Sequence, residues 1–349
     1  MTYLAKPPLH HPAAPTNALG YTRRDYEGAV STLCAGCGHD AISAAIIEAC
    51  FELDLPPHRL AKLSGIGCSS KMPTYFLGAA HGFNSVHGRM PSVLTGANLA
   101  NRSMIYLGIS GDGDSASIGF GQFGHSLRRG VRMVYLVANN GVYGLTRGQF
   151  SATADHGSAS RRGAVNMDEP VDLIGLALLL GATFVARGFS GDRDQLVPII
   201  KAALLHPGAA FIDCISPCVA FNNHQGSTKS FDYVRAHDHA VTRIDFDSPE
   251  AGAHDADAGT ASAARNRPPA ARVEALVPGY DVHDRLAVMD YLARHGASGE
   301  SVTGVLYVAP DAQDLHAHLD TVDEPLNALQ EDALCPGGAA LEEFNTALR

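Results

Sequence analysis

The chain has 349 residues, of which 36 are acidic and 26 are lysine or arginine, so its formal net charge is −10. Lysine and arginine form no run that could neutralise a phosphate backbone, so nucleic acid is not an expected partner. The most hydrophobic stretch, 173–186, is too short and too broken by glycine to span a bilayer, and residues 1–30 contain no apolar leader. We therefore expect a cytoplasmic chain that binds no membrane.

Short apolar runs alternate with longer amphipathic runs up to about residue 245, which predicts an α/β fold with a mostly parallel sheet covered by helices. Helices are predicted over 41–53, 117–129, 170–180 and 194–205, and strands over 104–110, 132–139, 183–187 and 209–215. The segment 246–272 is rich in Ala, Asp, Gly and Pro and indicates a flexible linker. We therefore divide the chain into an N-terminal arm (1–30), a main domain (31–245), this linker and a C-terminal extension (273–349).

Two polar motifs follow neighbouring strands of the predicted sheet. Gly111-Asp112-Gly113 comes directly after the strand 104–110, at the strand end where open α/β sheets bind ligands. Asn139-Asn140 closes the next strand. A carboxylate and an amide oxygen at neighbouring strand ends can share one Mg²⁺ with diphosphate oxygens, although Gly-Asp-Gly by itself is also common in ordinary turns.

Four cysteines lie in loop-like sequence. Cys34 and Cys37 form a Cys-x-x-Cys motif, Cys68 follows about thirty residues later, and Cys218 comes just after the strand 209–215. This spacing matches neither a zinc ribbon nor the tight cysteine run of small bacterial ferredoxins. The odd total of seven cysteines argues against a disulfide framework. Spacing alone leaves zinc, a redox dithiol, buried thiols and an iron–sulfur cluster open.

The two polar motifs resemble the diphosphate-binding motif of thiamine diphosphate enzymes. The resemblance implies that the side chains of Asp112 and Asn140 and the backbone carbonyl of Val142 bind Mg²⁺, which ties the diphosphate to the protein. Thiamine diphosphate carries its own carbanion chemistry, so the motif identifies a cofactor and not a reaction.

Six segments in a fixed order extend this resemblance over about residues 20–240. They are LCAGCGHD, SGIGCSSKMPTY, HGFNSVHGRMPSVLTGANLAN, SGDGDS, NNGVYGLTRGQFSATA and FIDCISPCVAFN. Together they resemble the β subunits of the 2-oxoacid:ferredoxin oxidoreductases. The resemblance implies a thiamine diphosphate-binding fold and a [4Fe–4S] cluster ligated by Cys34, Cys37, Cys68 and Cys218. The remaining cysteines, Cys50, Cys214 and Cys335, would then not be ligands.

The resemblance also implies a reaction and partners. The reaction is the coenzyme A-dependent oxidative decarboxylation of a 2-oxoacid, most simply 2-oxoglutarate to succinyl-CoA and CO₂, with single electrons passing through the cluster to ferredoxin. The reverse carboxylation uses the same groups. A separate α subunit would complete the site, in an αβ or α₂β₂ assembly. The alternatives are pyruvate or another 2-oxoacid as substrate, a non-redox thiamine diphosphate decarboxylase subunit, and a structural metal-binding subunit.

Residues near the substrate are implied by the same segments. Lys71 and Leu145 match positions associated with the choice of 2-oxoacid, and the lysine suits the distal carboxylate of 2-oxoglutarate, although it could also be a solvated loop residue. His87 is expected to hydrogen-bond near the reacting centre with support from Arg89, and His39 is given no role. The resemblance places the cofactor against Ile66, Gly67, Cys68, Ser69, His87, Gly111, Asp112, Gly113, Asp114, Asn140, Val142, Gly144 and Leu145.

Overall fold

A central sheet organises the computed structural model, which describes residues 11–160, 163–246 and 270–349. Its strands run in the order β2-β1-β3-β4-β8-β7-β12-β9, and every neighbouring pair is parallel except β12 against β7. The strands are β1 (Leu60–Ser64), β2 (His81–Asn84), β3 (Ile105–Gly111), β4 (Met133–Asn139), β7 (Phe184–Phe189), β8 (Ala209–Ile215), β9 (Asp238–Ala240) and β12 (Ser301–Val308).

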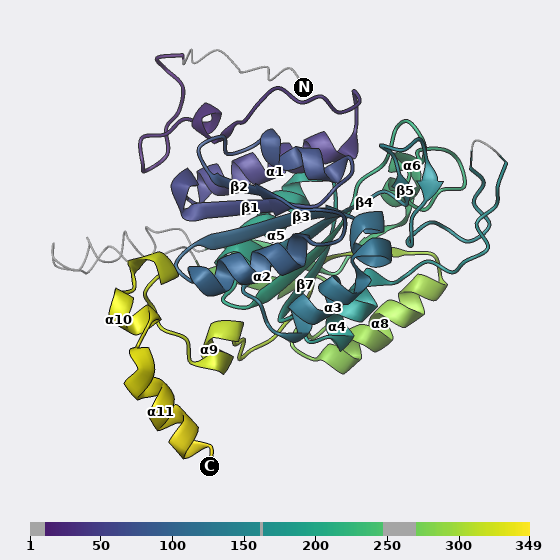
Figure 1. Cartoon of the computed structure of the whole chain (residues 1–349). Coiled ribbons are helices and arrows are strands. Elements are labelled where there is room, and N and C mark those ends of the chain that lie inside the picture. The colour runs from purple at the N-terminus through teal and green to yellow at the C-terminus, as the bar shows by residue number, and fades with distance from the viewer. Residues whose placement is uncertain (1–10, 161–162, 247–269) are drawn as a thin grey trace.

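Helices cover both faces of this sheet, which confirms the predicted α/β fold (Figure 1). One face is covered by α1 and α5, which contact each other, and the other by α2, α3, α4 and α8. The helices are α1 (Gly38–Glu52), α2 (Met90–Ala100), α3 (Phe120–Arg128), α4 (Leu173–Leu179), α5 (Arg193–Leu205), α6 (Phe231–His237), α8 (Arg285–Ala297), α9 (Leu315–Leu319), α10 (Glu331–Leu334) and α11 (Gly337–Ala347). No helix among the described residues is both long and apolar enough to cross a bilayer.

Shorter elements connect the layers. A π-helix, η4 (Asp114–Ile118), links β3 to α3, and two small hairpins lie outside the main sheet: β5 (Val142–Tyr143) with β6 (Gln149–Phe150), and β10 (Thr242–Phe246) with β11 (Ala271–Ala275). The 3-10 turns are η1 (Arg23–Tyr26), η2 (Pro57–Arg59), η3 (Ser69–Thr74) and η5 (Leu326–Ala328).

The apolar runs of the sequence become the buried centre of the sheet. Every residue of β4 and β8 is buried, as expected for parallel strands covered on both faces. Phe123 of α3, Tyr135 of β4 and Phe211 of β8 pack edge to face, with ring centroids 5.2–6.1 Å apart. This rigid centre fixes the carboxyl ends of β3, β4 and β8, where the polar motifs begin.

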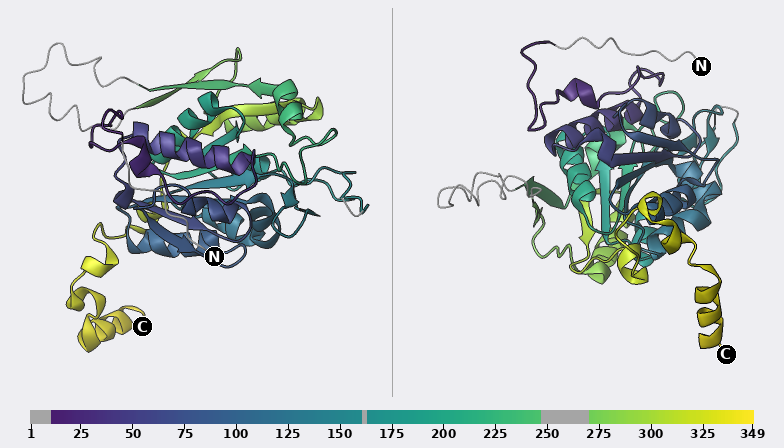
Figure 2. Two further views of the ribbon diagram at one scale, coloured as in Figure 1. Left: turned by 90° about the horizontal axis from the view of Figure 1, so that it is seen from above. Right: turned by 60° about the vertical axis from the view of Figure 1, so that its left-hand side comes forward.

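The C-terminal extension contributes to the main sheet, because β12 pairs with β7 on one side and with β9 on the other. Beyond it, α10 and α11 project away from the body (Figure 2). Neither helix has a buried residue. The predicted linker, 246–272, lies almost entirely outside the described residues, so the proposed division of the chain into segments stays a prediction.

Candidate active site

The two polar motifs lie side by side at one edge of the sheet. β3 and β4 are neighbours, with Ser110 opposite Val137 and Gly111 opposite Ala138, so Asp112 and the Asn139–Asn140 pair follow adjacent strand ends. The backbone N–H of Asn140 donates to Oδ1 of Asp112 at 3.3 Å. The expectation that the two motifs meet in space is therefore confirmed.

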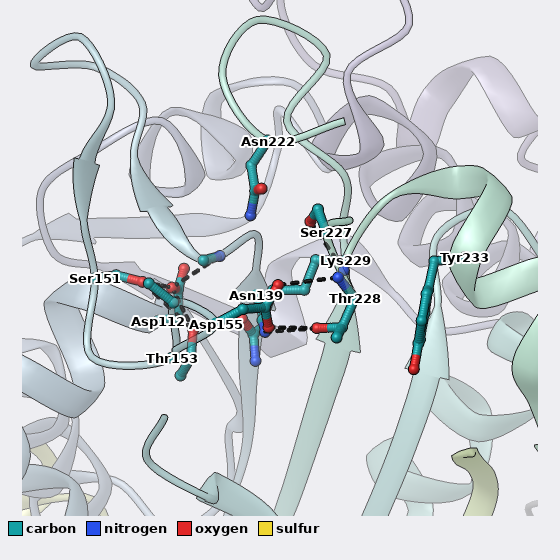
Figure 3. A network of polar contacts seen from close by, with 12 residues as sticks. Asp112, Asn139, Ser151, Thr153, Asp155, Asn222, Ser227, Thr228, Lys229 and Tyr233 are labelled. Atoms are coloured by element: carbon teal, nitrogen blue, oxygen red, sulfur yellow. Dashed lines mark hydrogen bonds and ion pairs between the residues drawn. The ribbon is translucent and has the colours of Figure 1, made fainter. Parts of the chain in front are cut away.

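The carboxylate of Asp112 is buried and held from one side (Figure 3). Its Oδ2 accepts hydrogen bonds from the N–H of Gly141 at 3.1 Å, from Thr153 Oγ1 at 2.7 Å and from Ser151 Oγ. Among the residues that the structure describes, its Oδ1 accepts only the longer bond from Asn140. All of these donors are uncharged, and a buried carboxylate without a positive partner is costly. Oδ1 is thus available to a cation.

The amide of Asn140 has a defined orientation. Its Oδ1 accepts from the N–H of Val142 at 3.0 Å, so its Nδ2 faces Nε2 of His39 at 3.4 Å. Burial lowers the pKa of His39 to about 4, so the imidazole is neutral. Its Nε2 then accepts from Asn140, and its Nδ1–H donates to Ser216 Oγ at 2.6 Å. His39 therefore orients Asn140. This role could not be predicted from the sequence, where His39 lies two residues after Cys37 and far from Asn140.

A cavity of about 270 Å³ opens beside these groups. Every residue that the sequence resemblance placed against the cofactor lines it, and their contact with a cofactor stays a prediction. The sequence pattern missed five further lining residues: His39, Ile118, Ala138, Tyr143 and Thr146. Tyr143 could have been found from its place in the segment NNGVYG, whereas Ile118 and Ala138 carry no polar signal.

His87 lies at this cavity and is held by a buried carboxylate. Its Nδ1 is 2.6 Å from Oδ1 of Asp114, which also accepts from the N–H of Gly88 at 2.9 Å. Oδ2 of Asp114 accepts from Ser110 Oγ at 3.1 Å. A carboxylate accepts hydrogen bonds, so Nδ1 carries the proton and Nε2 is the ring atom left for a ligand. Asp114 thus acts on the site through His87.

The other predicted substrate residues are spread more widely. Leu145 lines the cavity and is 55% exposed. Lys71 does not line it, and its Nζ lies 3.4 Å from the carbonyl oxygen of Thr32. The guanidinium of Arg89 donates to Gln122 Oε1 at 3.1 Å, and no hydrogen bond joins it to His87 within the described part of the chain. The roles proposed for Lys71 and Arg89 stay predictions.

Four cysteines from three loops converge next to the cavity. The sulfurs of Cys68 and Cys218 each lie 3.6 Å from the position that a Cβ on Gly144 would occupy. Burial, together with the neighbouring thiols of Cys218 and Cys68, raises the pKa of Cys37 to about 11. Burial also raises the pKa of Cys68, and Cys218 and Cys34 add to this effect. The remaining cysteines lie elsewhere: Cys50 in α1, Cys214 in β8 and Cys335 after α10.

A second group of ligand-type side chains, His239, His295 and Glu300, does not form a metal site. Their ligand atoms lie within 4.8 Å of one another. However, the two imidazoles are stacked, with centroids 4.8 Å apart and planes 17° from parallel, so their lone pairs do not converge on one ion. His239 Nε2 bonds to Tyr291 at 2.5 Å and His295 Nδ1 bonds to Glu300. We assign this group to the packing of α8 against the sheet.

Comparison with known proteins agrees with this geometry. The family model described as "Thiamine pyrophosphate enzyme, C-terminal TPP binding domain" matches residues 65–214. The chain is 34% identical to 2-oxoglutarate synthase subunit KorB of Methanocaldococcus jannaschii, over 58% of this chain and 74% of that protein. It is 38% identical to 2-oxoglutarate oxidoreductase subunit KorB of Mycobacterium tuberculosis and 41% identical to a 2-oxoacid:ferredoxin oxidoreductase β subunit of Saccharolobus solfataricus. The matches cover 58% and 54% of this chain, which spans only 52% and 63% of those two proteins.

The similarity extends to the whole fold. A solved 2-oxoglutarate:ferredoxin oxidoreductase from Magnetococcus marinus, with 2-oxoglutarate, coenzyme A and succinyl-CoA bound, superimposes with a TM-score of 0.72. The match is 28% identical and covers 90% of this chain and 94% of that chain. The chain with paired polar motifs at the ends of β3 and β4 therefore belongs to the family of 2-oxoacid:ferredoxin oxidoreductase β subunits.

Proposed function

We propose that this chain is the β subunit of an enzyme that converts 2-oxoglutarate, with coenzyme A, to succinyl-CoA and CO₂ and passes the electrons singly to ferredoxin. One observation carries the proposal. Cys68 and Gly144 line the cavity that Asp112 and Asn140 border, and the sulfurs of Cys68 and Cys218 both lie against Gly144. A thiamine diphosphate decarboxylase without redox chemistry has no use for a cysteine cluster at this position.

The residues at the strand ends fit a magnesium ion and a diphosphate. Mg²⁺ prefers oxygen ligands and keeps several from water or phosphate. Asp112 Oδ1, Asn140 Oδ1 and the carbonyl of Val142 would supply the protein's share, and the bonds to Gly141, Ser151 and Thr153 keep Asp112 in place. Thiamine diphosphate supplies the carbanion chemistry of the reaction when it is bound.

The four converging cysteines fit an iron–sulfur cluster better than a zinc ion. Tetrahedral zinc with bonds of about 2.3 Å needs sulfurs about 3.8 Å apart. Within the described residues, these cysteines are not among the side chains whose ligand atoms gather closely enough to hold a single metal ion. A wider arrangement suits a [4Fe–4S] cluster, whose cysteines bind separate irons. Cys34, Cys37, Cys68 and Cys218 would be its ligands.

The protein's own side chains would orient the substrate. Asp114 fixes the proton of His87 on Nδ1, so Nε2 can hydrogen-bond to the 2-oxoacid or move a proton there. Leu145 would border the substrate side chain, and Lys71 would move from its contact near Thr32 to pair with the distal carboxylate. The names of the relatives and of the solved structure support 2-oxoglutarate as that substrate.

Exposed apolar side chains near the cavity support a partner chain. Ile118 and Leu145 line the cavity and are 46% and 55% exposed, and Phe83, Val86 and Phe120 are 47%, 70% and 47% exposed. Large apolar groups gathered in this way mark interaction surfaces. An α subunit covering them would complete the cofactor and coenzyme A sites, in an αβ or α₂β₂ enzyme of the cytoplasm. We expect the β chain alone to be inactive.

The test is anaerobic co-purification with the α subunit from the same organism. We expect about four irons per β chain, broad absorbance in the blue, and bleaching when 2-oxoglutarate and coenzyme A are added together. Bleaching by pyruvate and not by 2-oxoglutarate would identify pyruvate as the substrate. Zinc without iron, or thiamine diphosphate turnover without bleaching, would contradict the redox function and favour a non-redox decarboxylase.

A further inference from the structure

A polar network joins the two loops that border the proposed cofactor and cluster sites (Figure 3). The segment 149–155, here the metal segment, supplies Ser151 and Thr153 to Asp112 and ends at Asp155. Residues 216–230, here the cluster loop, carry Cys218 and contain no helix or strand. Backbone turns within the loop and side-chain contacts to its neighbours hold it in place.

Asp155 makes three of these contacts. Its carboxylate accepts from the N–H of Thr228 at 2.9 Å, from the hydroxyl of Thr228 at 2.5 Å and from Nζ of Lys229 at 3.1 Å. The side chains of Lys229 and Asp155 are only 11% and 16% exposed. Burial alone would raise the pKa of Asp155, but Lys229 and Thr228 outweigh it and lower that pKa, so the pair is ionic.

Lys229 also packs on the turn that carries Asn140. Its Cδ and Cε lie 3.0 and 3.6 Å from the position of a Cβ on Gly141, so the aliphatic stem covers the backbone there. Gly141 has a φ of +71° and donates its N–H to Asp112. Asn222, also in the cluster loop, donates from Nδ2 to the carbonyl of Asn140 at 2.9 Å. The cluster loop therefore contacts the Asn140–Val142 turn at two points.

We propose that Lys229 and Asp155 are positioning residues that clamp the cluster loop onto the metal segment and the Asn140–Val142 turn, so that the cofactor site and the cluster site keep one arrangement. The inference rests on the proposed function for the identity of the two bound groups. The clamp itself rests only on contacts within this chain. Loss of either partner leaves a nearly buried charge without its ionic partner, which weakens the junction between the two loops.

The test compares Lys229→Met and Asp155→Asn with wild type and with Lys201→Met as a matched control. Lys201 is 12% exposed and pairs with Glu52 at 2.9 Å, between α5 and α1, so its loss breaks a similar ion pair away from the site. Hydrogen exchange followed by mass spectrometry on the full chain measures the amide exchange rates of the loops and needs no cofactor. Binding of thiamine diphosphate with Mg²⁺, and the electron paramagnetic resonance spectrum of the reduced cluster, read the two sites.

We expect the Lys229 and Asp155 variants to speed amide exchange in both the metal segment, 149–155, and residues 216–224 of the cluster loop, to weaken thiamine diphosphate binding about tenfold and to alter the cluster spectrum. Lys201→Met should change none of these. Loops that exchange as in wild type, or faster exchange in only one of the two segments, would overturn the clamp. Wild-type protein that binds neither thiamine diphosphate nor iron would instead overturn the proposed function, and the exchange data would still decide the clamp.

Discussion

Replacing Asp112 with asparagine tests the metal site with little change in shape. In the structure, Oδ2 of Asp112 faces three donors, from Gly141, Ser151 and Thr153. The single oxygen of an asparagine is favoured at that position, since the N–H of Gly141 there is closer, at 3.1 Å, than the N–H of Asn140 beside Oδ1, at 3.3 Å. The NH₂ group then points where Oδ1 of Asp112 now lies, and it cannot ligate a cation. We expect Asp112→Asn to fold and to lose magnesium-dependent binding of thiamine diphosphate.

The expected size of the effect follows from linkage. A ligand at a hundred times its Kd stabilises the folded state by about 2.7 kcal/mol. An unfolding entropy of about 2.1 cal/mol/K per residue gives about 0.7 kcal/mol/K over 349 residues. The cofactor should therefore raise the Tm of the wild type by about 4 °C and that of Asp112→Asn by much less than this.

The assay is thermal unfolding with and without thiamine diphosphate and Mg²⁺. Asp314→Asn is a matched control, because Asp314 is also buried but caps α9 through the N–H of Ala317, a role that asparagine can fill. The control should keep the full rise in Tm. An equal rise in Asp112→Asn would refute the assignment of Asp112 as a metal ligand.

Four further predictions concern other residues. Cys218→Ser should lose iron while Cys214→Ser, four residues away in β8, keeps about four per chain, as measured by metal analysis. His87→Ala should lower kcat about a hundredfold at unchanged iron content, in assays with the α subunit. Lys71→Ala should raise the KM for 2-oxoglutarate about tenfold and leave that for pyruvate unchanged. Burial lowers the pKa of Lys62 in the folded protein from 10.5 to about 8. Between these pH values Lys62 is protonated in the unfolded chain and largely neutral in the folded one. The unfolding free energy of wild type should therefore rise with pH relative to Lys62→Met, as measured by urea titration at pH 8 and pH 10.

Much of the architecture was predictable because buried parallel strands have a strong signal. The runs 132–139 and 209–215 are almost wholly apolar, and they form β4 (Met133–Asn139) and β8 (Ala209–Ile215). β1 and β2 were missed, since Lys62 interrupts the apolar run of β1 and β2 is exposed and polar. The pairing of β12 with β7 was not predictable either, because antiparallel pairing between segments over a hundred residues apart leaves no local pattern.

The sequence alone indicated which chemistry the site could hold, because Asp112 and Asn140 follow two predicted strand ends and six segments, four cysteines among them, resemble one family. The tertiary structure decided how these groups are held. His39 orients Asn140, Asp114 directs His87, and Lys229 joins two loops, and each contact links residues that the fold brings together from distant positions. A hydrogen bond depends on distance and direction, and these are set by the packing of the whole sheet and not by local sequence.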